Sequence, residues 1–148
     1  NSYWIAGILQ HQKIFLPVGD ARGSFIDTRD IAAAAAELLV TDSRNNEAFN
    51  LTGEESLNHT EVAEILSEVT GKTITYEDIP PSAMKESLLE AGMSKEYTEL
   101  LLGSLEAFKL GYSATVSSNV RDIIGRVPIT LRRNNIIFFA VVNDPVLS

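Results

Sequence analysis

Three charged residues close together in the sequence have the types needed for acid–base chemistry. Asp27, Arg29 and Asp30 place two carboxylates beside a guanidinium, and paired carboxylates can move protons at an active site. The same residues also suit the start of a helix, because Asp27 or Thr28 can accept a backbone N–H. Asp30 then lies in the first turn, where the helix dipole favours negative charge. We favour this structural interpretation, in which Asp27 caps a helix and none of these residues is catalytic.

Metal and thiol chemistry is not indicated by the sequence. The chain has no cysteine, which excludes a disulfide framework, a thiolate zinc site and a cysteine nucleophile. Its two histidines, His11 and His59, lie 48 residues apart without the spacing of metal ligands, so we expect no metal site. The lack of cysteine is typical of a reducing compartment, and we expect a cytoplasmic protein.

Apolar residues gather at three places in the sequence. Tyr3, Trp4 and Phe15 could line an apolar pocket, with core packing as the alternative. Five consecutive alanines, residues 32–36, suit a helix that packs closely against another element. A stripe at helical spacing is predicted to be core, with a lid over a ligand as the alternative; it consists of Met84, Leu88, Leu89 and Met93.

Hydrophobic periodicity and turn residues predict helices that alternate with strands. Asn58 and Glu61 have the spacing of a capping box, and Gly71 stands where a left-handed residue should end that helix. Ser82 and Ser94 are predicted to cap two later helices. The predicted helices cover residues 3–10, 28–40, 59–70, 83–91 and 95–109, and the predicted strands cover residues 13–16, 24–26, 48–51 and 72–77. This alternation is typical of an α/β fold.

Length, composition and charge narrow the function classes. The chain has 148 residues, of which 45% are hydrophobic, and its net charge is −8, as for one acidic globular unit. Residues 37–106 hold 15 carboxylates against four basic side chains. This balance argues against nucleic-acid binding through a basic face. No apolar run approaches the ~18 residues that a membrane span requires.

Several well-known motifs and segments are missing from the sequence. No G-x-G-x-x-G follows a predicted strand, and neither G-x-x-x-x-G-K-[ST] nor G-x-S-x-G occurs. The chain begins at Asn1 without a basic and apolar leader, so we expect no signal peptide. The lack of an initial Met indicates that the chain has been cut from something longer.

Three segments, in order, resemble the NmrA-like family of atypical short-chain dehydrogenase/reductases. Residues 19–32 are similar to the family's "G-D … F-I-D-V-R-D-I-A" pattern. Residues 49–57 are similar to "y-x-L-T-G-P-E-x-L-S", and residues 60–72 to the "x-E-x-A-x-x-L-S-x-x-T-G-K" that follows it. Residues 125–130, Gly-Arg-Val-Pro-Ile-Thr, are similar to the terminal "G-K-x-P-x-T-F". The resemblance covers about residues 1–131.

The resemblance implies an α/β fold that is the C-terminal, substrate-side part of a Rossmann-like NAD(P)-binding fold. The family's front half carries the glycine-rich loop for the dinucleotide and any catalytic Tyr and Lys, and neither matches this sequence. Residues 1–131 would then be the substrate-binding portion of an NAD(P)-dependent oxidoreductase, inactive by itself. NAD or NADP is implied for the full-length protein, and no cofactor is expected on this chain alone.

The resemblance also implies partners and binding residues. The expected substrate is a small quinone-like or carbonyl compound, and a homo-oligomer through an exposed sheet edge is expected, without a nucleic-acid or membrane partner. Tyr3, Trp4 and Phe15 lie in the family segment whose aromatic residues border the substrate cleft. Arg22 lies near the phosphate-binding Arg of nucleotide-sugar relatives, although theirs sits one residue nearer the equivalent of the following Phe.

Other interpretations stay open. A dinucleotide-sensing regulatory protein of the same family would lack the catalytic Tyr and Lys upstream. A relative of the nucleoside-diphosphate-sugar epimerases is weakened by the shifted Arg22, and an interaction module is the least specific alternative. Residues 132–148 depart from the family with an apolar run after a basic pair. That tail is either an extra strand or a foreign end, and it would be prone to aggregate if exposed.

Overall fold

The computed structural model describes residues 2–133, with side chains from residue 5 onward except that of residue 43. The predicted tail, residues 132–148, therefore lies almost wholly outside the described residues. The described chain confirms the predicted α/β class. Its elements are α1 (Ser2–His11), β1 (Lys13–Leu16), β2 (Gly23–Ser24), α2 (Thr28–Val40), the 3₁₀ turn η1 (Asp42–Arg44), β3 (Ser56–Leu57), α3 (His59–Thr70), β4 (Thr75–Asp78), α4 (Pro81–Glu90), α5 (Lys95–Lys109) and α6 (Asn119–Ile124).

A parallel pair of strands lies at the centre of the core. β1 pairs with β4, so that Ile14 lies opposite Tyr76 and Leu16 opposite Asp78. Parallel strands need a long crossover connection, and α3 is the part of that connection that contacts both strands. The buried side chains around this pair form one cluster, which contains Ile8, Ile14, Leu16, Val18, Val62, Ala63, Leu66, Ile74, Met84 and Leu88.

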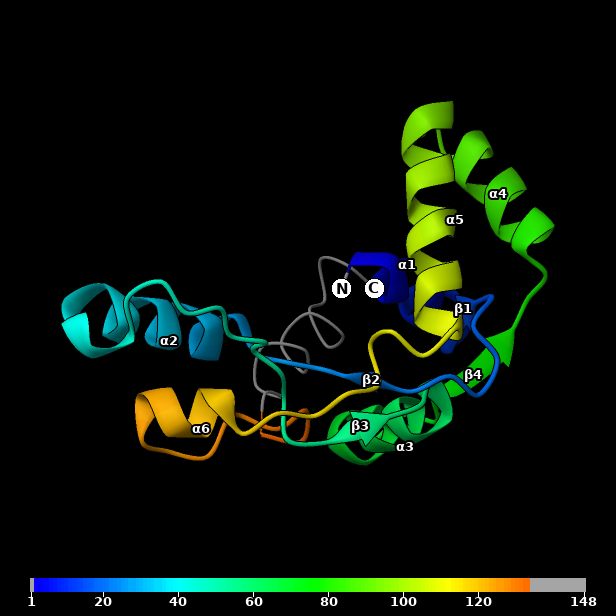
Figure 1. Cartoon of the computed structure of the whole chain (residues 1–148). Coiled ribbons are helices and arrows are strands. Elements are labelled where there is room, and N and C mark those ends of the chain that lie inside the picture. The colour runs from blue at the N-terminus through cyan, green and yellow to red at the C-terminus, as the bar shows by residue number, and fades with distance from the viewer. Residues whose placement is uncertain (1, 134–148) are drawn as a thin grey trace.

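The elements gather into two groups joined by extended chain (Figure 1). The strands β1 and β4 lie with α1, α3, α4 and α5, whereas α2 and α6 lie side by side away from them. Between the groups, β2 and β3 pair antiparallel with Gly23 opposite Leu57. An added Cβ at Gly23 would lie 2.3 Å from the ring of Phe108. A larger residue at position 23 would therefore require the Phe108 ring to move.

The start of α3 is fixed by hydrogen bonds within one helical turn. Asn58 accepts the backbone N–H of Glu61, and Glu61 accepts that of Asn58, each at 2.9 Å, which confirms the predicted capping box. The hydrogen bond from the Asn58 N–H holds the pKa of Glu61 below its ordinary value, and Arg22 adds to this effect. Gly71 ends the helix with φ of +67°, as predicted.

The two helices after β4 agree with the predictions in extent but only partly in their caps. Ser94 accepts the N–H of Tyr97 at the start of α5, as predicted. The predicted cap at Ser82 is wrong, because α4 begins at Pro81 and Pro80 stands in the cap position. Proline suits the first helical position, since its φ is already helical and its missing N–H would have no partner there.

The predicted strand over residues 48–51 is wrong for the described chain. A strand requires a neighbouring strand, and within residues 2–133 none pairs with this segment. The carbonyl of Asn50 instead accepts hydrogen bonds from Ser117 Oγ and Asn119 Nδ2. The strand that does form nearby is β3, while β2 is shorter and β4 later than predicted. Helix α6 was not predicted, because its six residues are too few to show a periodic pattern.

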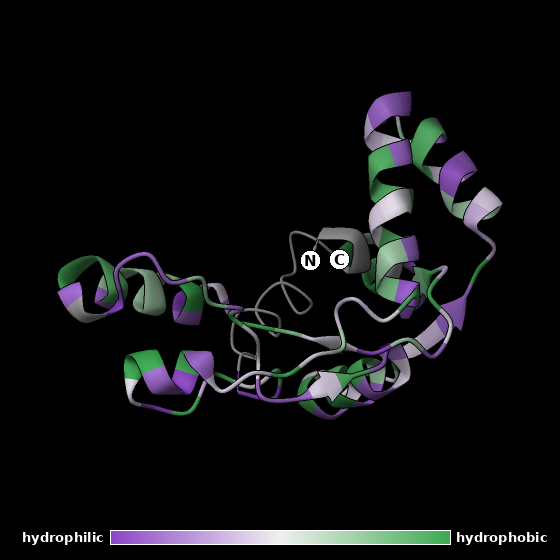
Figure 2. Ribbon diagram, in the orientation of Figure 1, coloured by the Kyte–Doolittle hydropathy of each residue, from purple (hydrophilic) through white to green (hydrophobic). Residues whose placement is uncertain are grey.

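Helix α2 is covered on one side only. Asp30 and Ala34 are its buried residues, whereas three of the five alanines, Ala32, Ala35 and Ala36, are exposed. Close packing of the alanine run is therefore found along one face. Leu39 is 87% exposed and Val40 is 81% exposed, and Figure 2 shows the outer end of α2 in green, at the edge of the molecule.

We predict that the chain associates with itself, because exposed apolar surface and free strand edges both favour self-association. Light scattering at tens of micromolar should give a mass above the 16.2 kDa of one chain. Replacing Leu39 and Val40 together by lysine should shift the chain toward the monomer. Glu64→Lys, on exposed α3 surface, is the control and should not. A monomeric mass for the unmodified chain would contradict the prediction.

A buried histidine lies in the core among aromatic rings. His59 is 3% exposed, and its ring centroid lies 5.4 to 5.8 Å from those of Phe108, Tyr76 and Phe25. Burial disfavours the charged imidazolium and lowers the pKa of His59 to about 4. Burial also raises the pKa of Tyr76 to about 12.

The burial of His59 predicts acid-sensitive stability. In the unfolded chain the pKa of His59 returns to about 6.5. Between pH 6.5 and about 4 the unfolded state therefore binds more protons than the folded state. The free energy of unfolding consequently falls as the pH falls through this window. The loss should approach about 3 kcal/mol at the acid end of this window. Urea unfolding at a series of pH values should show this slope in the unmodified chain and in His11→Phe. The prediction fails if His59→Phe keeps the same slope.

Candidate functional site

An apolar cleft lies between α1, β1 and α4. Its volume is about 490 Å³, within the range of pockets that hold small organic ligands. Three polar side chains, Gln10, His11 and Ser87, stand at its walls. The other lining residues are Ala6, Gly7, Phe15, Ile79, Met84, Leu88, Ala91 and Met93. The cleft can therefore enclose an apolar molecule and offer it a small number of hydrogen bonds.

The alternation of β1 turns Phe15 toward this cleft. Ile14 and Leu16 are buried in the core, while Phe15 on the opposite face of the strand is half-buried. The rings of Phe15 and His11 meet edge to face, with centroids 5.9 Å apart. Gly7 permits α1 to lie this close, because an added Cβ would be 2.5 Å from the carbonyl oxygen of Lys13.

The methionine and leucine stripe of α4 supplies another wall of the cleft. Met84 and Leu88 are buried, as the core prediction required, whereas Leu89 and Met93 are 41% and 42% exposed. Met84, Leu88 and Met93 all border the cleft. The helical spacing of these residues in the sequence indicated an apolar face on α4. No pattern in the sequence indicated that α1, with Gln10, would form the opposite wall of the cleft.

Of the other residues proposed from the sequence, Arg22 does not border the cleft. The side chains of Tyr3 and Trp4 lie outside the described residues, although their backbone belongs to α1. Arg22 is engaged elsewhere: its Nε and Nη2 donate to the carbonyl of Ser56 at 3.0 and 2.6 Å, and Nη2 also donates to Glu61 at 2.7 Å. These bonds tie the chain before β2 to β3 and the start of α3.

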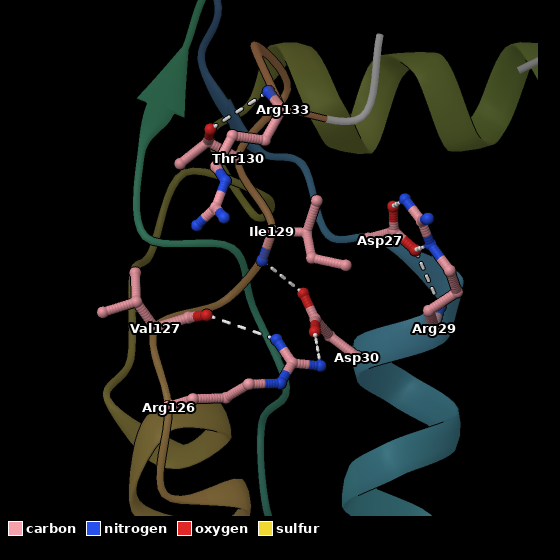
Figure 3. Close-up of polar contacts among 8 residues, drawn as sticks. All are labelled: Asp27, Arg29, Asp30, Arg126, Val127, Ile129, Thr130 and Arg133. Atoms are coloured by element: carbon pink, nitrogen blue, oxygen red, sulfur yellow. Dashed lines mark hydrogen bonds and ion pairs between the residues drawn. The ribbon is translucent and has the colours of Figure 1, made fainter. Parts of the chain in front are cut away.

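A polar cluster surrounds the start of α2 (Figure 3). Asp27 is 5% exposed and accepts the N–H of Arg29 at 2.8 Å, which confirms it as the helix cap. The guanidinium of Arg29 turns back onto the same carboxylate, with Nε to Oδ1 at 2.9 Å and Nη2 to Oδ2 at 2.7 Å. This pairing holds the pKa of Asp27 below its ordinary value, so the carboxylate stays ionised and serves as a cap.

Asp30 is completely buried and joins α2 to the chain after α6. Its Oδ2 accepts the N–H of Ile129 at 2.6 Å, and its Oδ1 pairs with Arg126 Nη2 at 2.7 Å. The expected place of Asp30 in the first turn is correct, but its burial and its partners were not predicted. For the pairing of Asp30 with Arg126 the sequence offered only a weak signal, namely that Arg126 lies in the segment that resembles the family's terminal motif.

Neither Gly19, after β1, nor the two prolines after β4 offer a free backbone N–H to the pyrophosphate of a dinucleotide. Such a group needs free backbone N–H groups where a parallel strand ends. After β1, the N–H of Gly19 donates to the Asp78 carboxylate at 2.9 Å, and after β4 the chain continues into Pro80 and Pro81, which have no N–H. Within residues 2–133 no group of acidic and histidine side chains is placed to hold a metal ion. In the same part of the chain, every helix is too short or too polar to cross a bilayer.

Comparison with known proteins decides the family. A family model described as the NmrA-like family matches residues 8–122. The chain belongs to the NmrA-like family. The match spans most of the described residues and includes α1 from Ile8 onward, the cleft residue Phe15, and both β1 and β4. The resemblance seen in the sequence is thereby confirmed.

Members of the NmrA-like family with known names or structures resemble this chain over part of their length. An NAD(P)H azoreductase of Xenophilus azovorans is 29% identical over 119 residues, which are 80% of this chain and 42% of that protein. An NADPH-dependent quinone oxidoreductase of Escherichia coli, solved in complex with NADPH, superposes with a TM-score of 0.83 at 22% identity, over 93% of this chain and 50% of that one. A nucleoside-diphosphate-sugar epimerase of Staphylococcus aureus gives a TM-score of 0.80 at 25% identity, over 89% and 46%. The chain thus spans less than half the length of the curated relatives that it matches.

The capping role of Asp27 predicts graded losses of stability. Asp27→Ala removes the acceptor for the Arg29 N–H and should lower the free energy of unfolding by about 1 to 2 kcal/mol. Asp27→Asn should cost less, because the amide oxygen still caps and only the pairing with a half-exposed guanidinium is lost. Urea unfolding measures both. Equal losses for the two variants, or no loss for Asp27→Ala, would refute the capping role.

Proposed function

We propose that this chain forms the substrate-binding part of an NAD(P)-dependent oxidoreductase of the NmrA-like family. The observation that carries the proposal is the apolar cleft at Phe15, which lies in the segment that matches the family. The substrate would be a small neutral aromatic compound that carries a reducible carbonyl or quinone group. The nucleotide would be bound by another portion of the protein, and this chain by itself would be inactive.

The chemistry of the cleft supports a neutral aromatic substrate. Phe15 and the edge of the His11 ring offer aromatic contacts, while Met84, Leu88 and Met93 offer apolar side chains, of which the two methionines can adapt to different ring shapes. Among the residues that the structure describes, His11 is the one acidic or basic side chain that lines the cleft. A charged ligand would therefore lose its hydration without gaining an ion pair.

Two alternatives are less well supported by the described residues. A nucleotide-sugar epimerase would need a cation for the phosphates, and Arg22 is already bonded to Ser56 and Glu61. A dinucleotide-sensing regulatory protein would use the same fold without turnover. Unlike the proposed oxidoreductase, such a protein would not bind small aromatic ketones in the cleft.

Binding of an aryl ketone tests the proposal directly. The chain is titrated with 2-acetonaphthone, a neutral molecule of about 13 heavy atoms, and binding is followed by ligand-observed NMR. At about −0.3 kcal/mol per heavy atom or better, the dissociation constant should be about 1 mM or tighter. Phe15→Ala should weaken binding about tenfold, because an aromatic contact and buried area are lost.

The controls separate the cleft from other surface. Phe49→Ala removes a half-buried phenylalanine that borders a different hollow, and it should leave ketone binding unchanged. NADPH alone should not bind this chain at micromolar concentrations. Equal weakening by Phe15→Ala and Phe49→Ala, or no ketone binding at its solubility limit, would refute the proposal.

A further inference from the structure

The lining of the apolar cleft changes in character with depth. Among the residues that the structure describes, the buried ones in this lining are apolar: Met84 is 8% exposed and Leu88 is 9% exposed. The polar side chains of the lining, those of Gln10, His11 and Ser87, are all exposed. The cleft therefore has an apolar floor, formed by the first two residues, and a polar mouth, formed by the other three. We propose that the substrate binds with its aromatic part on the floor and with a single carbonyl oxygen at the mouth, against Gln10 and Ser87.

Helical spacing places a hydrogen-bond donor on each of two walls. On α4, Ser87 lies three positions after Met84 and next to Leu88, so its hydroxyl belongs to the face that carries the floor. On α1, Gln10 lies four positions after Ala6, and both border the cleft. The serine hydroxyl and the glutamine NH₂ group can both donate to a carbonyl oxygen. A ligand on the floor therefore meets donors from two different helices at the mouth.

The difference between floor and mouth narrows the class of substrate. This inference rests on the proposed function, in which the cleft binds a reducible aromatic compound. A para-quinone has carbonyl oxygens at opposite ends, so one of them would lie against Met84 and Leu88, whose side chains have no hydrogen-bond donor. A carbonyl oxygen that leaves water without gaining a hydrogen bond weakens binding. An aryl ketone with its carbonyl at one end avoids this loss, and the cleft therefore favours aryl ketones over para-quinones.

Two ligands of equal size test the substrate class. In para-isopropylacetophenone an isopropyl group replaces one acetyl group of para-diacetylbenzene, and the ring and the number of heavy atoms stay the same. Titration followed by ligand-observed NMR should show that the monoketone binds about tenfold tighter, because only the diketone must bury an unpaired carbonyl. Equal affinities would overturn the proposal. The isopropyl group is also the more apolar of the two groups, so the orientation of the bound monoketone is measured separately.

The methionines of the chain report this orientation. The chain has two methionines, and both border the cleft, Met84 at the floor and Met93 at a position that is 42% exposed. With isotope-labelled methionine methyl groups, the isopropyl protons of bound para-isopropylacetophenone should give nuclear Overhauser effects to Met84, and the acetyl protons should not. Met93→Leu assigns the two methyl signals. Overhauser effects from the acetyl protons to Met84 would overturn this inference and leave the proposed function standing, whereas failure of both ketones to bind would overturn both.

Substitutions at the mouth test the two hydrogen-bond donors. Gln10→Ala and Ser87→Ala should each weaken binding of para-isopropylacetophenone about threefold, the effect of one exposed hydrogen bond. Neither should change binding of para-cymene, which has the ring and the isopropyl group but no carbonyl. Gln12→Ala and Ser82→Ala are the matched controls, because both side chains are exposed and neither borders the cleft; circular dichroism checks that all four variants fold. Equal ketone affinities in the mouth and control variants, or weaker para-cymene binding in the mouth variants, would overturn the proposal.

Discussion

One buried carboxylate joins the start of α2 to the segment that follows α6. Asp30 is excluded from water and is compensated by the Ile129 N–H and by Arg126, 99 and 96 positions away. An ion in the protein interior must be partnered, and removal of one partner typically costs about 3 to 5 kcal/mol. The position of α2 against α6 and the orientation of Arg126 depend on this contact.

Local sequence predicted the features that depend on neighbours within one helical turn. The caps at Asp27 and Ser94 and the Asn58–Glu61 box could be read from residue types and spacing, since the bonds concerned span two or three residues. The burial of Asp30 could not, because its partners are about a hundred positions away. The predicted strand over residues 48–51 shows the same limit, since a strand exists only where another segment pairs with it.

The walls of the candidate cleft come from segments that are far apart in the sequence. Phe15 stood out in the sequence only as an aromatic residue near Tyr3 and Trp4 that could line an apolar pocket, and in the structure it borders the apolar cleft. The opposite wall required knowledge that α4 packs near α1, a fact of tertiary structure that no local pattern contains. His11 was considered only as a metal ligand, yet it lies against Phe15 at the edge of the cleft.

The contact between Asp30 and Ile129 also has a consequence for the order of folding. It joins residues that are 99 positions apart, and the entropy lost on closing such a loop rises with its length. The α4–α5 hairpin and the packing of α3 on β4 join segments close in sequence, so they can form early. Helices α2 and α6 can then dock only after the chain between them has become compact. We therefore expect their docking to come late in folding and their separation to come early in unfolding.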